Sequence, residues 1–453
     1  MFDKNFYIYE KDFDNKLLLL NLMTFEYQIL GYKDTVFWKN DQLERISVFE
    51  KLKEKNFILQ DKMLLHEKLK SLTKKKLKNP THVIFVTDEC NQKCPYCFEK
   101  DSDSLRKYGK TLSIDQSDYI IKMIKKINGE YGGNETKITL FGGEPLLLKN
   151  QSIIQHLLMK ISTLNGAEVN IVTNGITLDS YIDTVADNEA VISGVIVTLN
   201  GLKETHEVIR ISKDNPTFDR IINNIKLCLQ KTAKVMIDIN ILLEKRNINN
   251  IETLLKYLYE EGLLQDKRIR VRFGRIQSRT HADSFDYEFE LPYEDYYACL
   301  LDKYLNDSHS YIDVSMIGGS EVGFLGKLFR HWYLGEFIYP EVKGCEAVYP
   351  GRFCYYVDGN IYPCTEIAGN EQFKIGDYID GEIYEDKFDR WKNYDVLNLE
   401  KCRNCRFVGM CDGACPVTNK MKNGEIENVY CLRMEIALDK MIECLWKRGF
   451  FSE

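Results

Sequence analysis

The first 60 residues alternate short apolar stretches with polar ones, in a pattern typical of a small mixed α/β unit. Apolar runs of strand length cover residues 6–9, 17–22 and 57–59, and Leu43, Ile46, Phe49 and Leu52 recur at helical spacing between them. This order predicts a winged-helix-like unit over residues 1–78. Its last part, residues 68–78, is rich in lysine and is predicted to be a solvated helix and a linker.

From residue 81 onward, apolar runs of strand length alternate with helix-length amphipathic segments. The predicted strands are residues 82–87, 137–141, 168–173, 194–199, 234–241 and 269–273, and the clearest helices are 151–164, 218–230 and 251–261. Such alternation predicts a parallel sheet with right-handed crossovers. Six units are too few for a closed eight-stranded barrel, so we expect an α/β fold, a partial (β/α)6 TIM-like barrel over residues 79–280. In such barrels the chemistry lies at the carboxyl ends of the strands.

The remaining sequence has a different character. Residues 281–344 are rich in aromatic side chains without a clear strand and helix rhythm, and are predicted to bridge two domains. Cysteine and glycine dominate residues 345–453, as in domains that bound metal stabilises more than a large core does. Within them, residues 353–357 are predicted to begin a hairpin that turns at Asp358, Gly359 and Asn360.

Composition and charge narrow the class of protein. The chain has 453 residues, 44% hydrophobic and 28% charged, with a net charge of −7, which disfavours a dedicated nucleic-acid binder. It has no apolar run of the ~18 residues that a membrane helix needs. Its first residues show no secretory core. These features predict a cytoplasmic protein with no membrane or nucleic-acid partner.

Fourteen cysteines are the most informative feature, because clustered cysteines in a reducing compartment are usually metal ligands. Cys90, Cys94 and Cys97 follow the first predicted barrel strand with C-x3-C-x2-C spacing. Three thiolates on one loop suit a four-iron cluster with one iron left open for another ligand. A zinc site with a distant fourth ligand is the alternative.

This loop resembles that of the radical S-adenosylmethionine (SAM) superfamily, in which an aromatic residue, here Tyr96, precedes the third cysteine. The resemblance implies that Cys90, Cys94 and Cys97 hold a [4Fe-4S] cluster whose open iron chelates S-adenosylmethionine. It also implies that Tyr96 lies near the adenine. Reductive cleavage of the cofactor would then generate a 5′-deoxyadenosyl radical.

Two further motifs at strand ends support the resemblance. Gly142, Gly143, Glu144 and Pro145 look like the family's GGEP motif, which contacts the methionine amino group. Glycine permits a close backbone approach, and a carboxylate pairs well with an ammonium group. Thr173 and Asn174, which precede Gly175, resemble the family's TNG segment and are predicted to bind the cofactor.

A fourth segment matches the family only in part. Thr198 to Gly201, followed by Lys203, His206 and Arg210, resembles the S-x-D-G…K-x2-H-x3-R segment. The resemblance implies that Thr198 approaches the ribose or carboxylate of the cofactor and that Arg210 pairs with the carboxylate. Threonine replaces serine and Asn200 replaces aspartate, so the motif assigns no role to Asn200. His206 is interpreted as a structural residue.

The C-terminal cysteines resemble the SPASM extension of radical SAM enzymes that act on peptides. They show C-x13-G-x4-C spacing, then C-x2-C-x5-C-x3-C, then a last cysteine; two zinc ribbons are the alternative. The resemblance implies two auxiliary [4Fe-4S] clusters. The first is assigned to Cys345, Cys364 and Cys415, and the second to Cys402, Cys405, Cys411 and Cys431. Cys354 is predicted to complete the first set; otherwise that iron is open to a substrate thiolate.

The function implied by these resemblances is oxidative modification of a ribosomally made peptide, through a thioether or carbon–carbon crosslink. The expected partners are a precursor peptide, whose leader would bind residues 1–78, and a flavodoxin- or ferredoxin-type reductant. An anaerobic sulfatase-maturating enzyme is the alternative, although Thr365 stands where those enzymes carry aspartate. An iron–sulfur electron-transfer protein without radical chemistry is the third candidate. Cys228, Cys299 and Cys444 are predicted to be buried structural thiols, and no catalytic residue is identified.

Overall fold

The computed structural model describes residues 3–59, 79–99, 109–131, 135–276, 287–306, 311–317, 323–335, 345–348, 351–411, 415–431 and 433–451. The chain divides into two compact units. One contains Met1–Lys76, Pro292–Gly344 and Asp395–Glu453, and the other contains Leu77–Leu291 and Cys345–Tyr394. The predicted linker, residues 68–78, lies outside the described residues. These units follow spatial contacts rather than sequence segments, and the predicted domain boundaries remain a prediction.

The second unit is built on one ten-stranded sheet of order β11-β10-β9-β8-β7-β6-β12-β13-β14-β15. Its first six strands are parallel throughout and have the predicted positions. They are β6 Thr81–Thr87, β7 Thr136–Gly142, β8 Ala167–Thr173, β9 Ile192–Thr198, β10 Met236–Leu243 and β11 Ile269–Arg275. The prediction of a six-stranded partial barrel is therefore confirmed.

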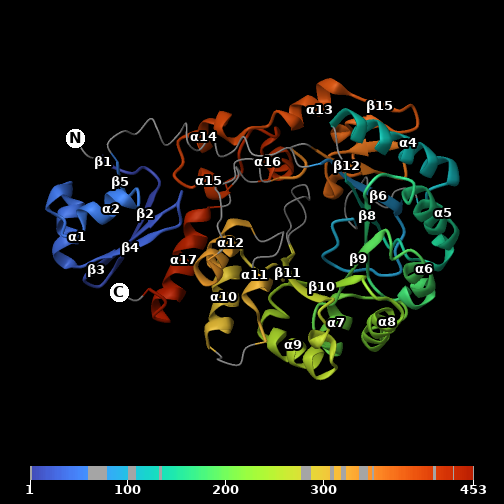
Figure 1. Cartoon of the computed structure of the whole chain (residues 1–453), viewed down its shortest axis with the longest axis horizontal. Helices are drawn as coiled ribbons and strands as arrows, with labels where there is room; N and C mark the ends of the chain where they lie inside the picture. Colours follow the sequence, from blue (N-terminus) through green and yellow to red (C-terminus); the bar gives the residue numbers. More distant parts are fainter. Residues whose placement is uncertain are drawn as a thin grey trace. The chain divides into compact units, whose positions relative to one another are not determined.

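Helices connect these strands and line the outer side of the curved sheet (Figure 1). They are α4 Ile114–Tyr131, α5 Gln151–Ile161, α6 Ile182–Asp187, α7 Lys203–Ile209, α8 Phe218–Lys231 and α9 Ile251–Glu260. Short 3-10 turns are η2 Leu148–Asn150, η3 Leu178–Tyr181, η4 Ile248–Asn250 and η5 Leu263–Gln265. Apolar side chains of α5, α8 and α9 are buried together with the strand side chains, as their helical spacing requires.

The predicted hairpin extends the barrel sheet. β12 Arg352–Tyr355 and β13 Asn360–Tyr362 are antiparallel, and β12 also pairs in parallel with β6, with Cys354 opposite Val83. Gly359 takes a φ of 97° at the turn, which favours glycine. The unit ends with η6 Thr365–Ile367, η7 Glu371–Phe373, β14 Gly376–Asp377, β15 Glu382–Ile383 and α13 Glu385–Lys392. The strand prediction is correct, but nothing in the local pattern predicts the pairing with β6.

The first unit contains a three-stranded antiparallel sheet of order β2-β3-β4. Its N-terminal elements are β1 Asp3–Lys4, β2 Ile8–Phe13, β3 Lys16–Asn21, β4 Tyr27–Leu30, α1 Tyr32–Lys39, η1 Leu43–Arg45, α2 Phe49–Glu54 and β5 Ile58–Leu59. Leu17, Leu19, Trp38, Leu52 and Phe57 form its core and are at most 1% exposed. The helical spacing over residues 43–52 thus corresponds to a 3-10 turn and a short helix.

The bridging region of this unit is mostly helical where the structure describes it. Its helices are α10 Tyr293–Asn306, α11 Val314–Ile317 and α12 Gly323–Leu334, and the C-terminal elements are η8 Val396–Asn398, α14 Glu400–Arg403, α15 Val408–Cys411, α16 Pro416–Asn423 and α17 Met434–Lys447. Helix α10 packs along α17 through ion pairs from Lys440 to Asp295 and from Arg448 to Asp302. The prediction of no clear rhythm was wrong here, because adjacent buried tyrosines such as Tyr296 and Tyr297 blur the helical period.

Strand β2 is held against α17 in the same unit. Lys11 Nζ lies 2.6 Å from Asp439 Oδ2 and 2.8 Å from Glu443 Oε1, and the Phe13 ring stacks on Trp446 at 4.0 Å. Residues near the two ends of the chain therefore share one core. Among the described residues, no helix combines the length and the apolar character that crossing a membrane requires.

His82 joins β6, β12 and α4. Its ring is fully buried, with Nδ1 3.0 Å from Tyr355 Oη and Nε2 2.9 Å from Asn128 Oδ1. Burial lowers the pKa of His82 to about 4, although the Asn128 contact opposes this shift.

We predict a pH dependence of stability from this histidine. Between about pH 6.5 and pH 4 the unfolded chain binds a proton at His82 that the folded chain does not, so stability is complete above this window and falls with pH inside it. At pH 5 the loss relative to pH 7.5 is about 2 kcal/mol. Because buried His206 also has a lowered pKa, both proteins lose stability, but the loss measured by denaturant unfolding should be about 2 kcal/mol larger in the wild type than in His82→Gln. An equal difference between the two proteins at both pH values would contradict the prediction.

Candidate functional site

The three cysteines of the first cluster lie on the loop that follows β6. Cys94 is buried, whereas Cys90 and Cys97 are partly exposed. The backbone N–H of Gln92 donates to Cys90 Sγ at 3.4 Å, and the N–H of Cys97 donates to the Cys94 carbonyl at 3.2 Å. In the described part of the chain, no three Cys, His, Asp or Glu side chains converge as a ready metal site. The three thiols thus lie on one loop, but their side chains do not converge on one point.

Arg210, just after α7, anchors this loop. Its Nη1 donates to Tyr96 Oη at 2.6 Å and its Nη2 donates to Gln92 Oε1 at 2.7 Å. The guanidinium is buried and lies close enough to Cys90 and Cys94 to interact electrostatically. Among the described residues it has no carboxylate partner, and its Nε has no hydrogen-bond acceptor. Arg210 and the buried Glu144 carboxylate interact electrostatically but form no ion pair in the described structure. A buried cation without a direct counter-ion, beside Cys90 and Cys94, favours an anionic group at this place.

Asn200 and His206, to which the sequence assigned no functional role, complete this network. Asn200 Nδ2 donates to Tyr96 Oη at 2.9 Å, and the Asn200 backbone N–H lies 3.3 Å from His206 Nδ1. Burial and the nearby Arg210 lower the pKa of His206 to about 3, so the ring is neutral at physiological pH. Burial also raises the pKa of Tyr96. Replacement of the family's aspartate by Asn200 was the only sequence signal for this contact.

Gly142 and Gly143, at the end of β7, allow two backbone segments to approach closely. Gly143 N donates to the Thr87 carbonyl at 2.9 Å and Glu144 N donates to the Glu89 carbonyl at 2.8 Å. A Cβ at Gly142 would lie 2.2 Å from Thr87 O, and one at Gly143 would lie 2.2 Å from Glu89 O. The segment therefore fits against the residues just before Cys90 only with glycine at both positions.

The Glu144 carboxylate accepts hydrogen bonds from its own loop and from the end of β8. Its Oε1 accepts from Leu146 N at 2.9 Å and from Thr173 Oγ1 at 2.7 Å, and its Oε2 accepts from Asn174 N at 2.7 Å. Burial raises the pKa of this carboxyl, while these hydrogen bonds oppose the shift. A carboxylate accepts about four hydrogen bonds, so it retains capacity for a further donor.

The other predicted cofactor residues lie around the same carboxyl ends. Asn174 Nδ2 donates to Asn91 Oδ1 at 2.7 Å, which joins the end of β8 to the cysteine loop. Pro145 is buried and its carbonyl accepts from Asn150 at 3.0 Å. Thr198 is buried at the end of β9, two residues before Asn200. The structure thus brings the predicted barrel residues to neighbouring strand ends.

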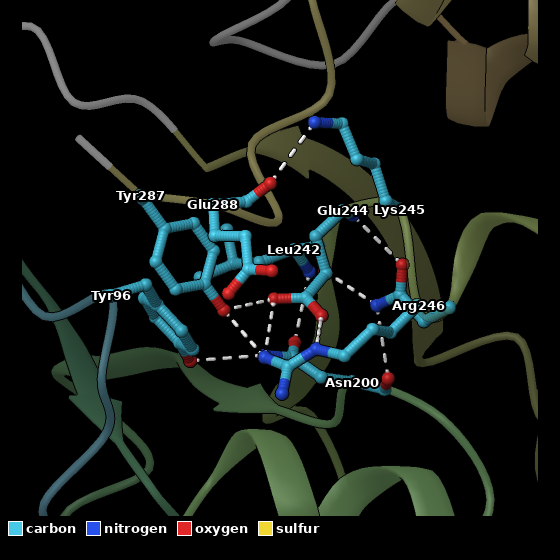
Figure 2. A network of polar contacts seen from close by, with 9 residues as sticks. Tyr96, Asn200, Leu242, Glu244, Lys245, Arg246, Tyr287 and Glu288 are labelled. Carbon is cyan, nitrogen blue, oxygen red and sulfur yellow. Dashed lines mark hydrogen bonds and ion pairs between the residues drawn. The ribbon is translucent and has the colours of Figure 1, made fainter.

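A second polar network at the end of β10 was not predicted (Figure 2). The Glu244 carboxylate is fully buried and accepts from Arg246 Nε, from Arg246 Nη2 at 3.0 Å and from Tyr287 Oη. The Arg246 guanidinium lies 3.9 Å from the centre of the Phe289 ring, and the Tyr287 ring lies 6.2 Å from that of Tyr96. The network therefore ties residues 287–291 to the strand end beside the cysteine loop. Glu244 and Arg246 are two residues apart, but Tyr287 lies 43 positions after Glu244, so no local spacing pattern reveals the network.

The chemistry of the barrel donors fits a four-iron cluster and an amino-acid cofactor. The loop offers three thiols, one of them accepting a backbone N–H, with a buried cation beside them. Gln92 Nε2 and Arg210 Nε are buried without acceptors in the described structure. Glu144 supplies an anion for an ammonium group.

The C-terminal cysteines are distributed over both units. Cys402, Cys405 and Cys431 lie near enough to interact electrostatically, and Cys405 Sγ accepts from Phe407 N at 3.4 Å. Burial, followed by these neighbours, raises the pKa of Cys402 to about 11. The same unit contains Cys411 and Cys415, and the other unit contains Cys345, Cys354 and Cys364. The predicted ligand assignments of these cysteines remain predictions.

Cys354 and the three thiols interpreted as structural differ in burial. Cys354 is fully buried on β12, and burial raises the pKa of its thiol to about 12. Cys228 on α8 is also fully buried, as predicted. Cys299 and Cys444 are only half-buried, on the packed helices α10 and α17. The apolar pattern of an amphipathic helix did not distinguish these two depths of burial.

Comparison with known sequences finds similarity over the residues of the barrel. The Radical SAM superfamily matches residues 84–258. GTP 3′,8-cyclase of Clostridium perfringens (strain SM101 / Type A) is 30% identical over 182 residues, which cover 40% of this chain and 52% of the cyclase. An uncharacterized protein of Archaeoglobus fulgidus is 21% identical over 358 residues, or 78% of each chain. This chain spans about half the length of the first curated relatives that it matches.

Solved structures share the fold over more of the chain. Native anSMEcpe with bound AdoMet has a TM-score of 0.59 at 18% identity, covering 82% of this chain and 98% of that one. SuiB of Streptococcus suis, bound to precursor peptide SuiA, has a TM-score of 0.53 at 17% identity and covers 95% and 99%. At these identities the likeness shows a common fold. It confirms the predicted fold class.

The glycine contact leads to a prediction. In Gly143→Ala the added Cβ would collide with the Glu89 backbone, so the cysteine loop and β7 must separate. We expect a loss of about 2 kcal/mol in unfolding free energy and a lower iron content after reconstitution. Gly129→Ala is the matched control, because its Cβ meets no atom within 4 Å. Equal stability and iron content in both variants would refute the role of this approach.

Proposed function

We propose that this chain, which carries a radical SAM superfamily domain over residues 84–258, is an enzyme that cleaves S-adenosylmethionine reductively and oxidatively modifies a peptide side chain. The observation that carries the proposal is the convergence of three motifs at the strand ends. Arg210 anchors the cysteine loop, and the backbone of Gly143 and Glu144 lies against the residues before Cys90. The Glu144 carboxylate is held by Thr173 and Asn174 at the end of β8.

The barrel residues have distinct roles in this proposal. Cys90, Cys94 and Cys97 hold a [4Fe-4S] cluster, and Glu144 receives the ammonium group of the cofactor. When bound, the cluster and S-adenosylmethionine supply a carbon-centred radical by reductive cleavage of the sulfonium bond. The ends of the barrel strands hold the target close and exclude water. Thr173, Asn174 and Thr198 line the same edge.

A peptide substrate is supported by the solved relatives and by the first unit. SuiB was solved with a precursor peptide, and anSMEcpe with the peptide Cp18Cys. In the first unit, β2 and β4 are the edges of a small sheet, and an exposed edge can pair with an extended peptide. We propose that residues 1–78 bind the leader of a precursor peptide. A flavodoxin- or ferredoxin-type protein is the proposed reductant.

The C-terminal cysteines favour a net oxidation. We propose that Cys345, Cys354, Cys364 and Cys415 hold one auxiliary [4Fe-4S] cluster and that Cys402, Cys405, Cys411 and Cys431 hold another. Such clusters supply an acceptor for the electron that forming a crosslink releases. Simple isomerisation would need no acceptor.

Cofactor cleavage is the first test. Reconstituted protein with S-adenosylmethionine and dithionite should release 5′-deoxyadenosine, and Cys94→Ala should release none and lose about four irons per chain. Cys228→Ala removes a buried thiol outside these motifs and should retain both properties. A reconstituted wild type that forms no 5′-deoxyadenosine would instead support an electron-transfer protein.

The substrate class is tested by product mass. Co-production with short peptides encoded beside its gene should yield a peptide lighter by two hydrogen atoms per thioether or carbon–carbon crosslink. A synthetic sulfatase peptide with a target cysteine provides the comparison, because conversion of cysteine to formylglycine replaces sulfur by oxygen and also removes two hydrogen atoms. That outcome alone would make the chain a sulfatase-maturating enzyme, the activity that the fold shared with anSMEcpe also permits.

A further inference from the structure

Two arginines on the last barrel strand, β11, share one buried carboxylate on β10. The Asp238 side chain is 3% exposed, and its Oδ1 and Oδ2 lie 2.6 Å from Arg270 Nε and 3.2 Å from Arg270 Nη2. Arg272 Nη2 pairs with the same Asp238 Oδ2. Two positive charges therefore face one negative charge, and the group retains one positive charge that no residue of the group balances.

The neighbouring arginines of this segment each have a carboxylate of their own. Arg268 Nη2 lies 2.7 Å from Asp266 Oδ2, and Arg275 Nη1 lies 2.7 Å from Glu290 Oε1. In the part of the chain that the structure describes, the sole carboxylate at ion-pair distance from Arg270 and Arg272 is that of Asp238. Their side chains are 52% and 36% exposed, and a guanidinium has five N–H donors, so both retain donors for another acceptor.

The register of the sheet shows on which face these residues lie. Side chains alternate between the two faces of a strand, and the odd-numbered residues of β10 are apolar and fully buried. One of them, Ile239, is paired with Val197 of β9. A Cβ at Gly175 would meet both Val197 and Ile221 of helix α8, so this apolar set faces the helices on the outer side of the sheet (Figure 1).

Asp238 and the two arginines therefore lie on the opposite, concave face. Arg270 is paired with Asp238, and Arg272 lies on the row that contains Asn240 and, at the end of β9, Thr198. Two strand spacings separate Arg272 from Thr198, or about 10 Å between their Cα atoms. Among the described strands, β11 is the edge of the sheet, so no further strand closes the barrel beside these arginines.

We propose that Arg270 and Arg272 bind a carboxylate of the peptide substrate, from an acidic side chain or from the C-terminus, on the concave face of the barrel. This inference rests on the proposed function. A carboxylate can accept hydrogen bonds from both guanidinium groups and balances their unpaired charge. An extended peptide advances about 3.3 Å per residue. An anchor about 10 Å from Thr198 therefore places the modified residue within about three positions of the carboxylate.

The experiment measures peptide binding without turnover. The probe is a pentapeptide with one central glutamate between serine and glycine residues, an N-terminal dansyl group and a C-terminal amide. Fluorescence anisotropy gives its dissociation constant for the reconstituted full chain in the absence of S-adenosylmethionine. The same peptide with glutamine should bind about tenfold more weakly, and the difference should shrink at high salt.

The two sources of the carboxylate are separated by a third peptide, which has the glutamine and a free C-terminus. Recovery of the tighter binding would support the site and assign it to a peptide terminus. Equal binding of the glutamate and glutamine amides, or binding of neither, would overturn the proposal.

Substitution of each arginine tests the site itself. Arg270→Gln and Arg272→Gln each leave Asp238 paired with the other arginine, so no buried carboxylate loses its counter-ion. We expect each variant to bind the glutamate peptide about tenfold more weakly and the glutamine peptide as the wild type does. Arg220→Gln is the matched control, because it removes the same charge from helix α8, where Arg220 pairs with Asp179 at 3.2 Å. An equal loss in this control would show a response to net charge alone and reject the site.

Asp238→Asn should give a change of opposite sign. It is isosteric and removes the carboxylate that competes for both guanidinium groups, so the glutamate peptide should bind about fivefold more tightly. If the three residues only stabilised the sheet, the unfolding midpoint would fall and binding would not tighten. Wild-type or weaker binding in a variant of normal iron content would contradict the proposal.

Failure of this inference is distinguishable from failure of the proposed function. A wild type that binds the glutamate peptide selectively but releases no 5′-deoxyadenosine would contradict the proposed function. A wild type that releases 5′-deoxyadenosine but does not distinguish the two amidated peptides would contradict this inference alone.

Discussion

The backbone contact between the Gly142–Gly143 segment and residues 87–89 is the constraint on which the rest of the site depends. Two N–H groups reach across to carbonyls of the neighbouring strand end, at a separation that leaves no space for a side chain. This contact fixes where the cysteine loop begins and where Glu144 stands. Thr173 and Asn174 then lock the Glu144 carboxylate from the next strand. Because adjacent parallel strands end at the same edge of the sheet, this close backbone contact also brings their polar side chains together there.

Two buried charges near this edge are balanced differently. Glu244 has its counter-ion in Arg246, with Tyr287 as a further donor, so this network is complete. Arg210 instead has neutral partners, Tyr96 and Gln92, and lies beside thiols. A complete ion pair stabilises the local structure, whereas a buried cation that has no direct ion pair in the described structure, although Glu144 interacts with it, favours binding of an anion. Arg246 and Arg210, 36 positions apart in sequence, therefore have different roles. Arg246 stabilises the local structure, and Arg210 favours a bound anion.

The local sequence pattern was sufficient to predict the barrel strands and the cysteine loop. It was insufficient to predict the long-range contacts around them. The strands could be predicted because parallel strands buried on both faces are continuous apolar runs, and the cysteine loop because its spacing is a local motif. The partners of Glu244 and Asn200 come from separate strands and loops, so no local spacing records them. The pairing of β12 with β6 could not be predicted for the same reason. Helix α10 was not predicted because its adjacent buried tyrosines, Tyr296 and Tyr297, obscure the helical period.

The pairing of β12 with β6 has a consequence for the modularity of such chains. Strand β6 is flanked on one side by β7, from its own barrel, and on the other by a segment more than 260 residues later. A protein fragment that ended after β11 would leave the amide and carbonyl groups of residues 81–84 without their partners on β12. The exposed edge of β6 would then be prone to pair with other chains. Recombination that exchanges the cysteine-rich region must therefore also supply a replacement for this border strand. The six barrel strands and β12 to β15 form one hydrogen-bonded sheet.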